Sequence, residues 1–245
     1  MSRAQAPLAS VDRALHLVGV ADEELAGRRL RVEGERVTIT RYERIALLLR
    51  TVDADIWSSP SLELKKNDVS WLEREARLHE AIVARAMIQG TVVPVHPFTV
   101  FPDSGALDEA ARTHYTRFRR SITRISGKAE WAVHVYRGPH RLPEISPYLL
   151  RTSLARPSED AAARKVHRPH GDHILQVWKS CSALATAARR MEALTDPQQL
   201  FCATFLVPQT RRDEFRETLA RLHPQAKELG LTYYLEGPRP AFNFI

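Results

Sequence analysis

The chain has 245 residues, of which 44% are hydrophobic and 27% are charged, and its formal net charge is +7. This composition excludes a disordered chain, and the length is sufficient to bury a core without a disulfide or a structural metal. The chain has no run of roughly 18 apolar residues, no signal-peptide pattern and no CxxC pair, so we expect a soluble cytoplasmic protein without a membrane partner.

Four short strands are expected at the start of the chain. The apolar run 14–20 is typical of a buried strand, and the run 45–49 is typical of a central strand. Residues 30–33 and 37–40 both alternate apolar with polar side chains, and Gly34-Glu35 between them predicts a tight hairpin turn. The fold is therefore expected to begin with antiparallel pairing.

Two long helices are expected next, with a strand between them. The first is predicted over 68–89, where apolar side chains recur at intervals of three and four and Gly90 offers a stop. The second is predicted over 106–125 from a similar apolar stripe. Residues 91–95 indicate a strand, and Pro94 favours an edge or a strand end because it cannot donate a ladder hydrogen bond.

The second half combines strands with a long helical block. Residues 143–195 are predicted to be mostly helical, with interruptions near Pro157 and around 169–171, and the last helix of the block is expected over 172–194. The other predicted elements are strands over 129–136, 200–207 and 231–235 and a helix over 213–229. Strands interleaved with helices indicate an α+β protein with antiparallel sheets, in which two modules meet near Gly127.

One histidine-rich segment has the composition of a metal site. His167, His170 and His173, together with Asp172, could bind zinc or nickel. A proline and a glycine between them disfavour a helix that would align the ligands, and a solvated loop between helices accounts for the segment equally well. We therefore predict no metal or cofactor site, and leave the role of these histidines open.

No residue carries a clear catalytic signature. The motifs GxGxxG, GxxxxGK[ST], GxSxG and HExxH are all absent. His79 lies on the apolar face of the first long helix, where a core or interface histidine is expected rather than a general base. Cys181 and Cys202 fall in apolar stretches, where a thiol behaves as a small hydrophobic group. We predict no catalytic residues and no small-molecule substrate.

The last residues of the chain are apolar and aromatic. Pro238 and Pro240 favour an extended backbone, and Phe242 and Phe244 follow in a segment too short to form a core alone. Such a segment must dock, either on its own protein or on a partner. We favour docking beside the last strand, because exposed apolar clusters lower solubility.

Three motifs occur together along the chain. The first is the helix with His79, followed by Gly90-Thr91-Val92-Val93-Pro94 and Phe98-Thr99-Val100-Phe101; the second is Gly127-Lys128-Ala129-Glu130-Trp131; the third is Gly237-Pro238-Arg239-Pro240-Ala241-Phe242-Asn243-Phe244. In this order and spacing they resemble the GvpL/GvpF family of gas vesicle proteins over nearly the whole chain. That family has Trp at the position of Arg239, Tyr at the position of Phe242, and Arg-Phe-Gly where this chain has 96–98.

The resemblance implies a fold and a role. The fold is α+β with two domains, a ferredoxin-like sandwich over 1–126 and an α+β domain rich in long helices over 127–245. The role is that of an accessory or minor structural protein of gas vesicle formation, with the hydrophobic shell protein and other gas vesicle proteins as partners. The resemblance carries over no catalytic residue and no cofactor, and it places the protein in the cytoplasm with the gas vesicle.

A shell protein that faces a gas space must expose apolar surface, which a soluble partner with apolar patches could shield. The residues expected to make this contact are Pro94, Phe98, Phe101, Pro238, Pro240, Phe242 and Phe244. Two other classes stay open as alternatives. A basic, ferredoxin-like nucleic-acid-binding protein would stack bases on strand aromatics such as Trp131 and Tyr136, and an enzyme would need a polar pocket around His79.

Overall fold

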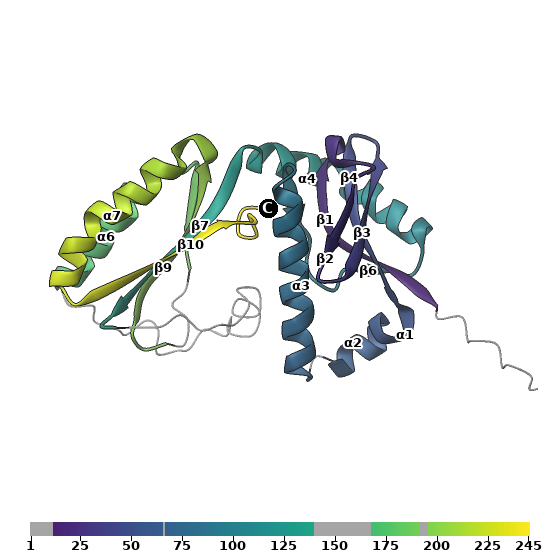
Figure 1. Cartoon of the computed structure of the whole chain (residues 1–245), viewed down its shortest axis with the longest axis horizontal. Helices are drawn as coiled ribbons and strands as arrows, with labels where there is room; N and C mark the ends of the chain where they lie inside the picture. The colour runs from purple at the N-terminus through teal and green to yellow at the C-terminus, as the bar shows by residue number, and fades with distance from the viewer. Residues whose placement is uncertain (1–11, 66, 140–167, 192–195) are drawn as a thin grey trace, which may run out of the picture.

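The computed structural model of the chain describes residues 12–65, 67–139, 168–191 and 196–245. The chain forms two antiparallel sheets with helices packed on them, so it is an α+β protein, as the sequence predicts. Figure 1 shows the two sheets side by side, with the last residues of the chain between them. None of the described helices is long and apolar enough to cross a membrane.

The first sheet is built around the long strand β1. Its order is β2-β3-β4-β1-β5, and β6 also pairs with β1, next to a different stretch of that strand. Its edge strand β5 ends at Pro94, as predicted for a residue without a backbone N–H. The strands are β1 (Arg13–Asp22), β2 (Arg29–Val32), β3 (Glu35–Tyr42), β4 (Ile45–Asp53), β5 (Val92–Pro94) and β6 (Val100–Phe101).

Helices cover both faces of this sheet. Leu47 on β4 packs in one core with α4, whereas its neighbour Leu48 packs in another with α3, because successive side chains of a strand point to opposite faces. Asp68 and Asp103 cap the two long helices, each accepting a hydrogen bond from a first-turn backbone N–H, at 3.0 and 2.9 Å. The helices are η1 (Glu23–Leu25, a 3-10 turn), α1 (Ala54–Trp57), α2 (Ser59–Lys65), α3 (Val69–Met87) and α4 (Ser104–Ile125).

The predicted early hairpin is confirmed, with its turn one residue before the expected position. Val32 pairs with Glu35, which leaves Glu33 and Gly34 as the two turn residues. Their φ angles are 50° and 87°, the positive values that a type I′ turn requires at both central positions. Gly34 adopts its positive φ without steric cost, which is why a glycine between two alternating runs predicts a turn here.

The second sheet is formed by the C-terminal half, in the order β10-β7-β9-β8. Two helices cover one of its faces, where Cys181 of α6 and Phe215 of α7 share a core with alternate residues of β7 and β9. The elements are β7 (Lys128–Arg137), α6 (Arg168–Ser182), β8 (Ala187–Arg190), β9 (Gln199–Pro208), η3 (Gln209–Arg211, a 3-10 turn), α7 (Arg212–Glu228) and β10 (Leu231–Arg239).

The strand–helix order differs between the two halves. After residue 127 the described sheet strands and α-helices follow one another as β-α-β-β-α-β, which is the order of a ferredoxin-like unit. In the first half of the chain, up to residue 127, four strands precede the first α-helix. The resemblance led us to expect the ferredoxin-like sandwich over 1–126, but among the described elements this order is found in the other half.

The helix predicted over 172–194 is wrong at both ends. α6 begins at Arg168 and passes through 169–171, because a proline in the first turn of a helix loses no intrahelical hydrogen bond. It ends at Ser182, and the alanine-rich residues that follow form the edge strand β8. Pairing with β9 decides this outcome against the helix propensity of alanine. The remainder of the helical block predicted over 143–195, including Pro157, lies outside the described residues.

Candidate functional site

The last residues of the chain lie at the junction of the two halves. Ala241 and Phe244 are buried, and they share one apolar cluster with Leu17 of β1, Leu107 of α4 and Leu206 of β9. We call this the junction cluster. It contains side chains from both halves, so the terminal segment 240–245 helps to hold the halves together. Docking on the chain's own surface was the favoured expectation for this segment.

Glu130 of β7 is the polar centre of the junction. Its side chain is fully buried. Arg239 donates to Oε1 from Nε at 3.0 Å and from Nη2 at 2.8 Å, and Asn243 donates from Nδ2 to Oε1 at 2.6 Å and from its backbone N–H to Oε2 at 2.9 Å. A buried carboxylate is tolerated when its charge and its acceptor sites are satisfied in this way.

Local geometry explains why these residues meet. Alternation along β7 turns Trp131 toward the helix-covered core and Glu130 toward the opposite face. Gly237, which precedes the terminal segment, has φ +141°, and a Cβ there would lie 2.8 Å from the Trp131 ring. Only glycine has room at this crossing and accepts this backbone angle. The second and third sequence motifs are therefore in direct contact.

The first motif reaches the same region through α3. His79 is fully buried, with its ring centroid 6.4 Å from that of Phe242 and 5.7 Å from that of His16 on β1. Burial lowers the pKa of His79 to about 3, although the Val95 carbonyl opposes this in part. Burial, His79 and Arg50 also lower the pKa of His16. Both histidines are neutral core residues at neutral pH, in agreement with the expectation for His79.

The predicted contact residues lie mainly inside the protein. Pro94 and Pro240 are buried, Phe101 and Phe244 pack in the junction cluster, and Phe242 is half-buried. Phe98 stacks against Trp71, with ring centroids 5.6 Å apart. Pro238 is exposed. Sequence reasoning missed the roles of Glu130 and Asn243, although an acidic residue inside an otherwise apolar strand signals a buried partner.

The histidine-rich segment is part of α6 in the described residues. His170 Nε2 lies 3.1 Å from the Leu229 carbonyl, and His173 contacts the Gln225 side chain and the Tyr233 hydroxyl. In the part of the chain that is described, no group of three or more His, Cys, Asp or Glu side chains could hold a metal. His167 lies outside the described residues.

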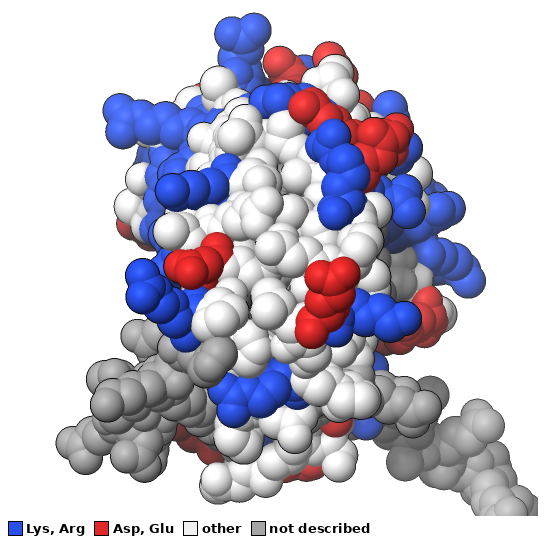
Figure 2. Space-filling model, turned by 90° about the vertical axis from the view of Figure 1, so that its left-hand side faces the viewer, with Lys and Arg blue, Asp and Glu red and all other residues white. Residues whose placement is uncertain are grey.

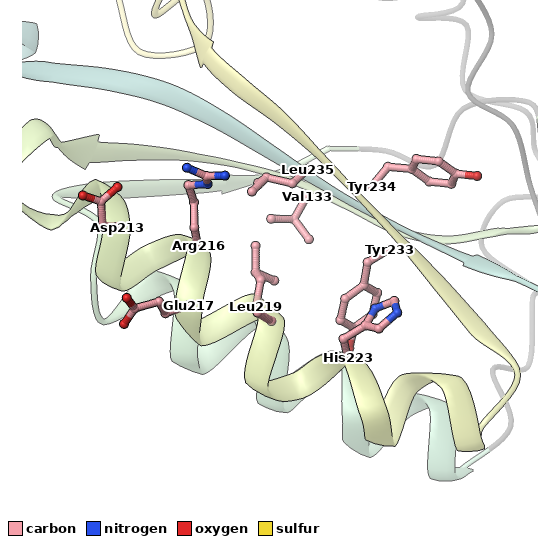
Figure 3. A pocket seen from close by; sticks show the side chains of 10 residues that line it. Val133, Asp213, Arg216, Glu217, Leu219, His223, Tyr233, Tyr234 and Leu235 are labelled. Carbon is pink, nitrogen blue, oxygen red and sulfur yellow. The ribbon is translucent and has the colours of Figure 1, made fainter.

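An open groove runs between α7 and β10, the edge strand of the second sheet (Figure 3). One part has a volume of about 540 Å³ and an apolar floor that includes Val133, Leu219 and Leu235. The charged side chains of Asp213 and Arg216 lie at its side. We call this surface, together with its continuation toward residue 238, the α7–β10 groove.

The groove continues along β10 to the motif residues. A second cavity of about 490 Å³ shares Arg216 and Leu235 with the first and is lined further by Trp131, Gly237 and Pro238. Figure 2 faces the α6–α7 side of the molecule and shows a band of uncharged residues with basic and acidic side chains on both flanks. This side of the protein therefore presents uncharged surface between charged side chains.

One sheet face near the groove is polar. Burial alone would lower the pKa of His134 on β7, but the neighbouring side chains of Cys202 and Glu236, whose Oε2 lies 3.7 Å from His134 Nε2, raise it to about 9. Glu236 Oε2 also lies 2.7 Å from Arg239 Nη1. Arg239 thus connects the buried Glu130 with a partly exposed carboxylate on β10.

The sequence and the fold both match known gas vesicle proteins. The family model "Gas vesicle synthesis protein GvpL/GvpF" matches residues 14–245. Gas vesicle protein L of Streptomyces sp. (strain CB03234) is 25% identical over 236 residues, which cover 87% of this chain and 84% of that protein. The crystal structures of GvpF from Anabaena sp. PCC7120 and from Microcystis aeruginosa are each 14% identical, with TM-scores of 0.67 and 0.66. The first match covers 94% of this chain and 97% of the other, and the second covers 96% and 99%.

Proposed function

Since the chain belongs to the GvpL/GvpF family of gas vesicle synthesis proteins, we propose that it acts in gas vesicle formation by binding the hydrophobic shell protein and other gas vesicle proteins during assembly. This role is one of binding rather than catalysis, and it is carried out in the cytoplasm at the growing vesicle. We further propose that the two sheets are the cores of two domains, 1–126 and 127–245, joined at Glu130.

The observation that carries this proposal is the α7–β10 groove. A shell subunit must keep apolar surface away from water until it is incorporated, and an apolar groove with a charged rim can cover such surface reversibly. Leu235 is 37% exposed in the described structure and lies among the apolar residues of the groove, so it is accessible to a bound partner. The end of the groove is built from Trp131 and Gly237, which belong to the motifs that mark the family resemblance.

The edge strand adds a second means of binding. Because β10 is the last strand of its sheet among the described residues, its outer backbone groups can pair with an extended segment of another protein. Such a segment would place alternate side chains over the groove floor. The shell protein, with its apolar side chains, is the partner that this surface suits best. Of the contact residues expected from the sequence, the exposed Pro238 lies at this groove.

The test is co-purification of the tagged protein with co-expressed shell protein at low and high salt. We expect retention at both salt concentrations, because apolar contacts are not screened. Leu235→Arg should abolish retention, since it fills the groove with a charge. The matched control is Leu64→Arg, because Leu64 of α2 is 77% exposed and lies outside the groove. Equal retention of the two variants would overturn the groove as the binding surface.

A further inference from the structure

The helix α4 carries an uninterrupted basic stretch. Between Glu109 and Glu130 the sequence has six arginine or lysine residues and no acidic residue. The helix buries Leu107 and Ile122 against the first sheet, so the opposite side of the helix faces outward. This outward side belongs to the other half of the molecule from the α7–β10 groove.

Three of these arginines form one face. Arg117, Arg120 and Arg124 have the spacing i, i+3 and i+7, which places them on one side of a helix over roughly 10 Å. All three are exposed. We call them the α4 arginine face.

The α4 arginine face has no acidic counterpart within the described residues. None of the ion pairs found there includes Arg117, Arg120 or Arg124, whereas other arginines, such as Arg50 and Arg77, pair with glutamates at 2.7 and 2.6 Å. A favourable interaction with the helix dipole explains positive charge only in the last turn of a helix. It therefore applies to Arg124 but not to Arg117 or Arg120.

The helix terminus already has another cation. Lys128 Nζ donates to the carbonyls of Arg124 and Ser126, at 2.8 and 3.3 Å. Lys128 therefore already supplies a positive charge at the end of α4. Within the described residues none of the three arginines has a carboxylate partner, so all three are available to a molecule outside the chain.

We propose that the α4 arginine face binds an acidic helix of a partner protein, with carboxylates repeating every three or four residues opposite the arginines. Arginine guanidinium groups accept carboxylates in a bidentate geometry, and a helix of matching spacing presents three of them in register. This surface lies apart from the α7–β10 groove, so the protein has two distinct binding surfaces.

An acidic protein suits this face better than a nucleic acid. Binding of single strands relies on aromatic side chains that stack on bases. The aromatic residues of this stretch, Tyr115 and Phe118, pack against the junction cluster instead.

The experiment measures binding of a fluorescent 20-residue helical peptide with glutamates on one face, by anisotropy at low salt. We expect the triple variant Arg117→Gln, Arg120→Gln, Arg124→Gln to bind about tenfold more weakly, as three exposed ion pairs imply. The control variant removes the same charge from exposed arginines of the β2–β3 hairpin, namely Arg29→Gln, Arg31→Gln and Arg36→Gln. It should bind within about twofold of the unmodified protein, since these sites lie away from α4.

Three results would overturn the proposal. Equal weakening in both triple variants would mean that net charge alone attracts the peptide. Equal binding of a peptide with the same composition but scrambled glutamate positions would remove the requirement for a matching helix face. Tighter binding of a single-stranded RNA of similar length, lost in the α4 variant, would identify a nucleic-acid surface instead. The variant Leu235→Arg should bind the peptide normally, which separates this test from that of the groove.

Discussion

Replacing Glu130 by glutamine should strongly destabilise the junction, although it changes only one oxygen of the side chain to an amide nitrogen. The carboxylate is fully buried and accepts four hydrogen bonds from Arg239 and Asn243. In Glu130→Gln an amide NH2 replaces one carboxylate oxygen and faces only hydrogen-bond donors. The side chain of Arg239 is 16% exposed, and its guanidinium loses its buried anionic partner.

The expected magnitude follows from this burial. Removing one partner of a buried ion pair costs about 3–5 kcal/mol, because the other charge is left uncompensated. Glutamine keeps one acceptor oxygen, and Arg239 keeps its ion pair with Glu236 at 2.7 Å. We therefore expect about 3 kcal/mol, the lower end of this range, for Glu130→Gln. For a protein of this size that corresponds to a fall in Tm of about 6–12 °C.

Urea unfolding followed by tryptophan fluorescence measures this cost, because Trp131 adjoins the junction. Glu236→Gln is the matched control. Glu236 pairs with the same arginine, Arg239, at 2.7 Å, but its side chain is 30% exposed, so its loss should cost at most about 1 kcal/mol. If the two variants lost the same stability, the assignment of Glu130 as the centre of the junction would be refuted.

Three further outcomes are expected. Burial lowers the pKa of His79 to about 3. The free energy of unfolding should therefore fall by about 1.4 kcal/mol per pH unit as the pH drops from 6.5 toward 3, because only the unfolded chain binds a proton at this histidine. Urea unfolding at pH 6.5 and at pH 4.5 should show a smaller loss of unfolding free energy between the two pH values for His79→Phe than for the unmodified protein. Gly237→Ala would force a Cβ to within 2.8 Å of the Trp131 ring and should lower Tm by several degrees more than Gly127→Ala, where nothing lies within 4 Å although φ is also positive. Burial raises the pKa of the Cys181 thiol to about 12, so iodoacetamide should label it only in denaturant, as mass spectrometry of the labelled peptide would show; labelling in the native state would contradict its place in the core.

Elements with strong periodicity could be predicted from the sequence. The alternation in β2 and β3 and the apolar stripes of α3 and α4 depend on neighbours along the chain, and the structure confirms each of them. β8 could not be predicted in this way. Its sequence, Ala187–Arg190, favours a helix, and only pairing with β9 makes it a strand.

The junction shows a second limit. Glu130 is 109 residues from Arg239 and 113 from Asn243 along the chain. An acidic residue in an apolar strand predicts a partner, but nothing in the local pattern identifies which residue it is. The α7–β10 groove is hidden for the same reason, because it is lined by residues from β7, α7 and β10 that meet only in the folded protein.

The terminal segment also determines how two bound partners would be arranged. By packing against both sheets, it holds the α7–β10 groove and the α4 arginine face at one separation and orientation. Two proteins bound at these surfaces would meet at an effective concentration far above that in the cell, without any change in either affinity. Loosening the contact at Glu130 would leave each binary complex intact and weaken the ternary complex. The junction would then fix the distance between the two partners of a scaffold protein.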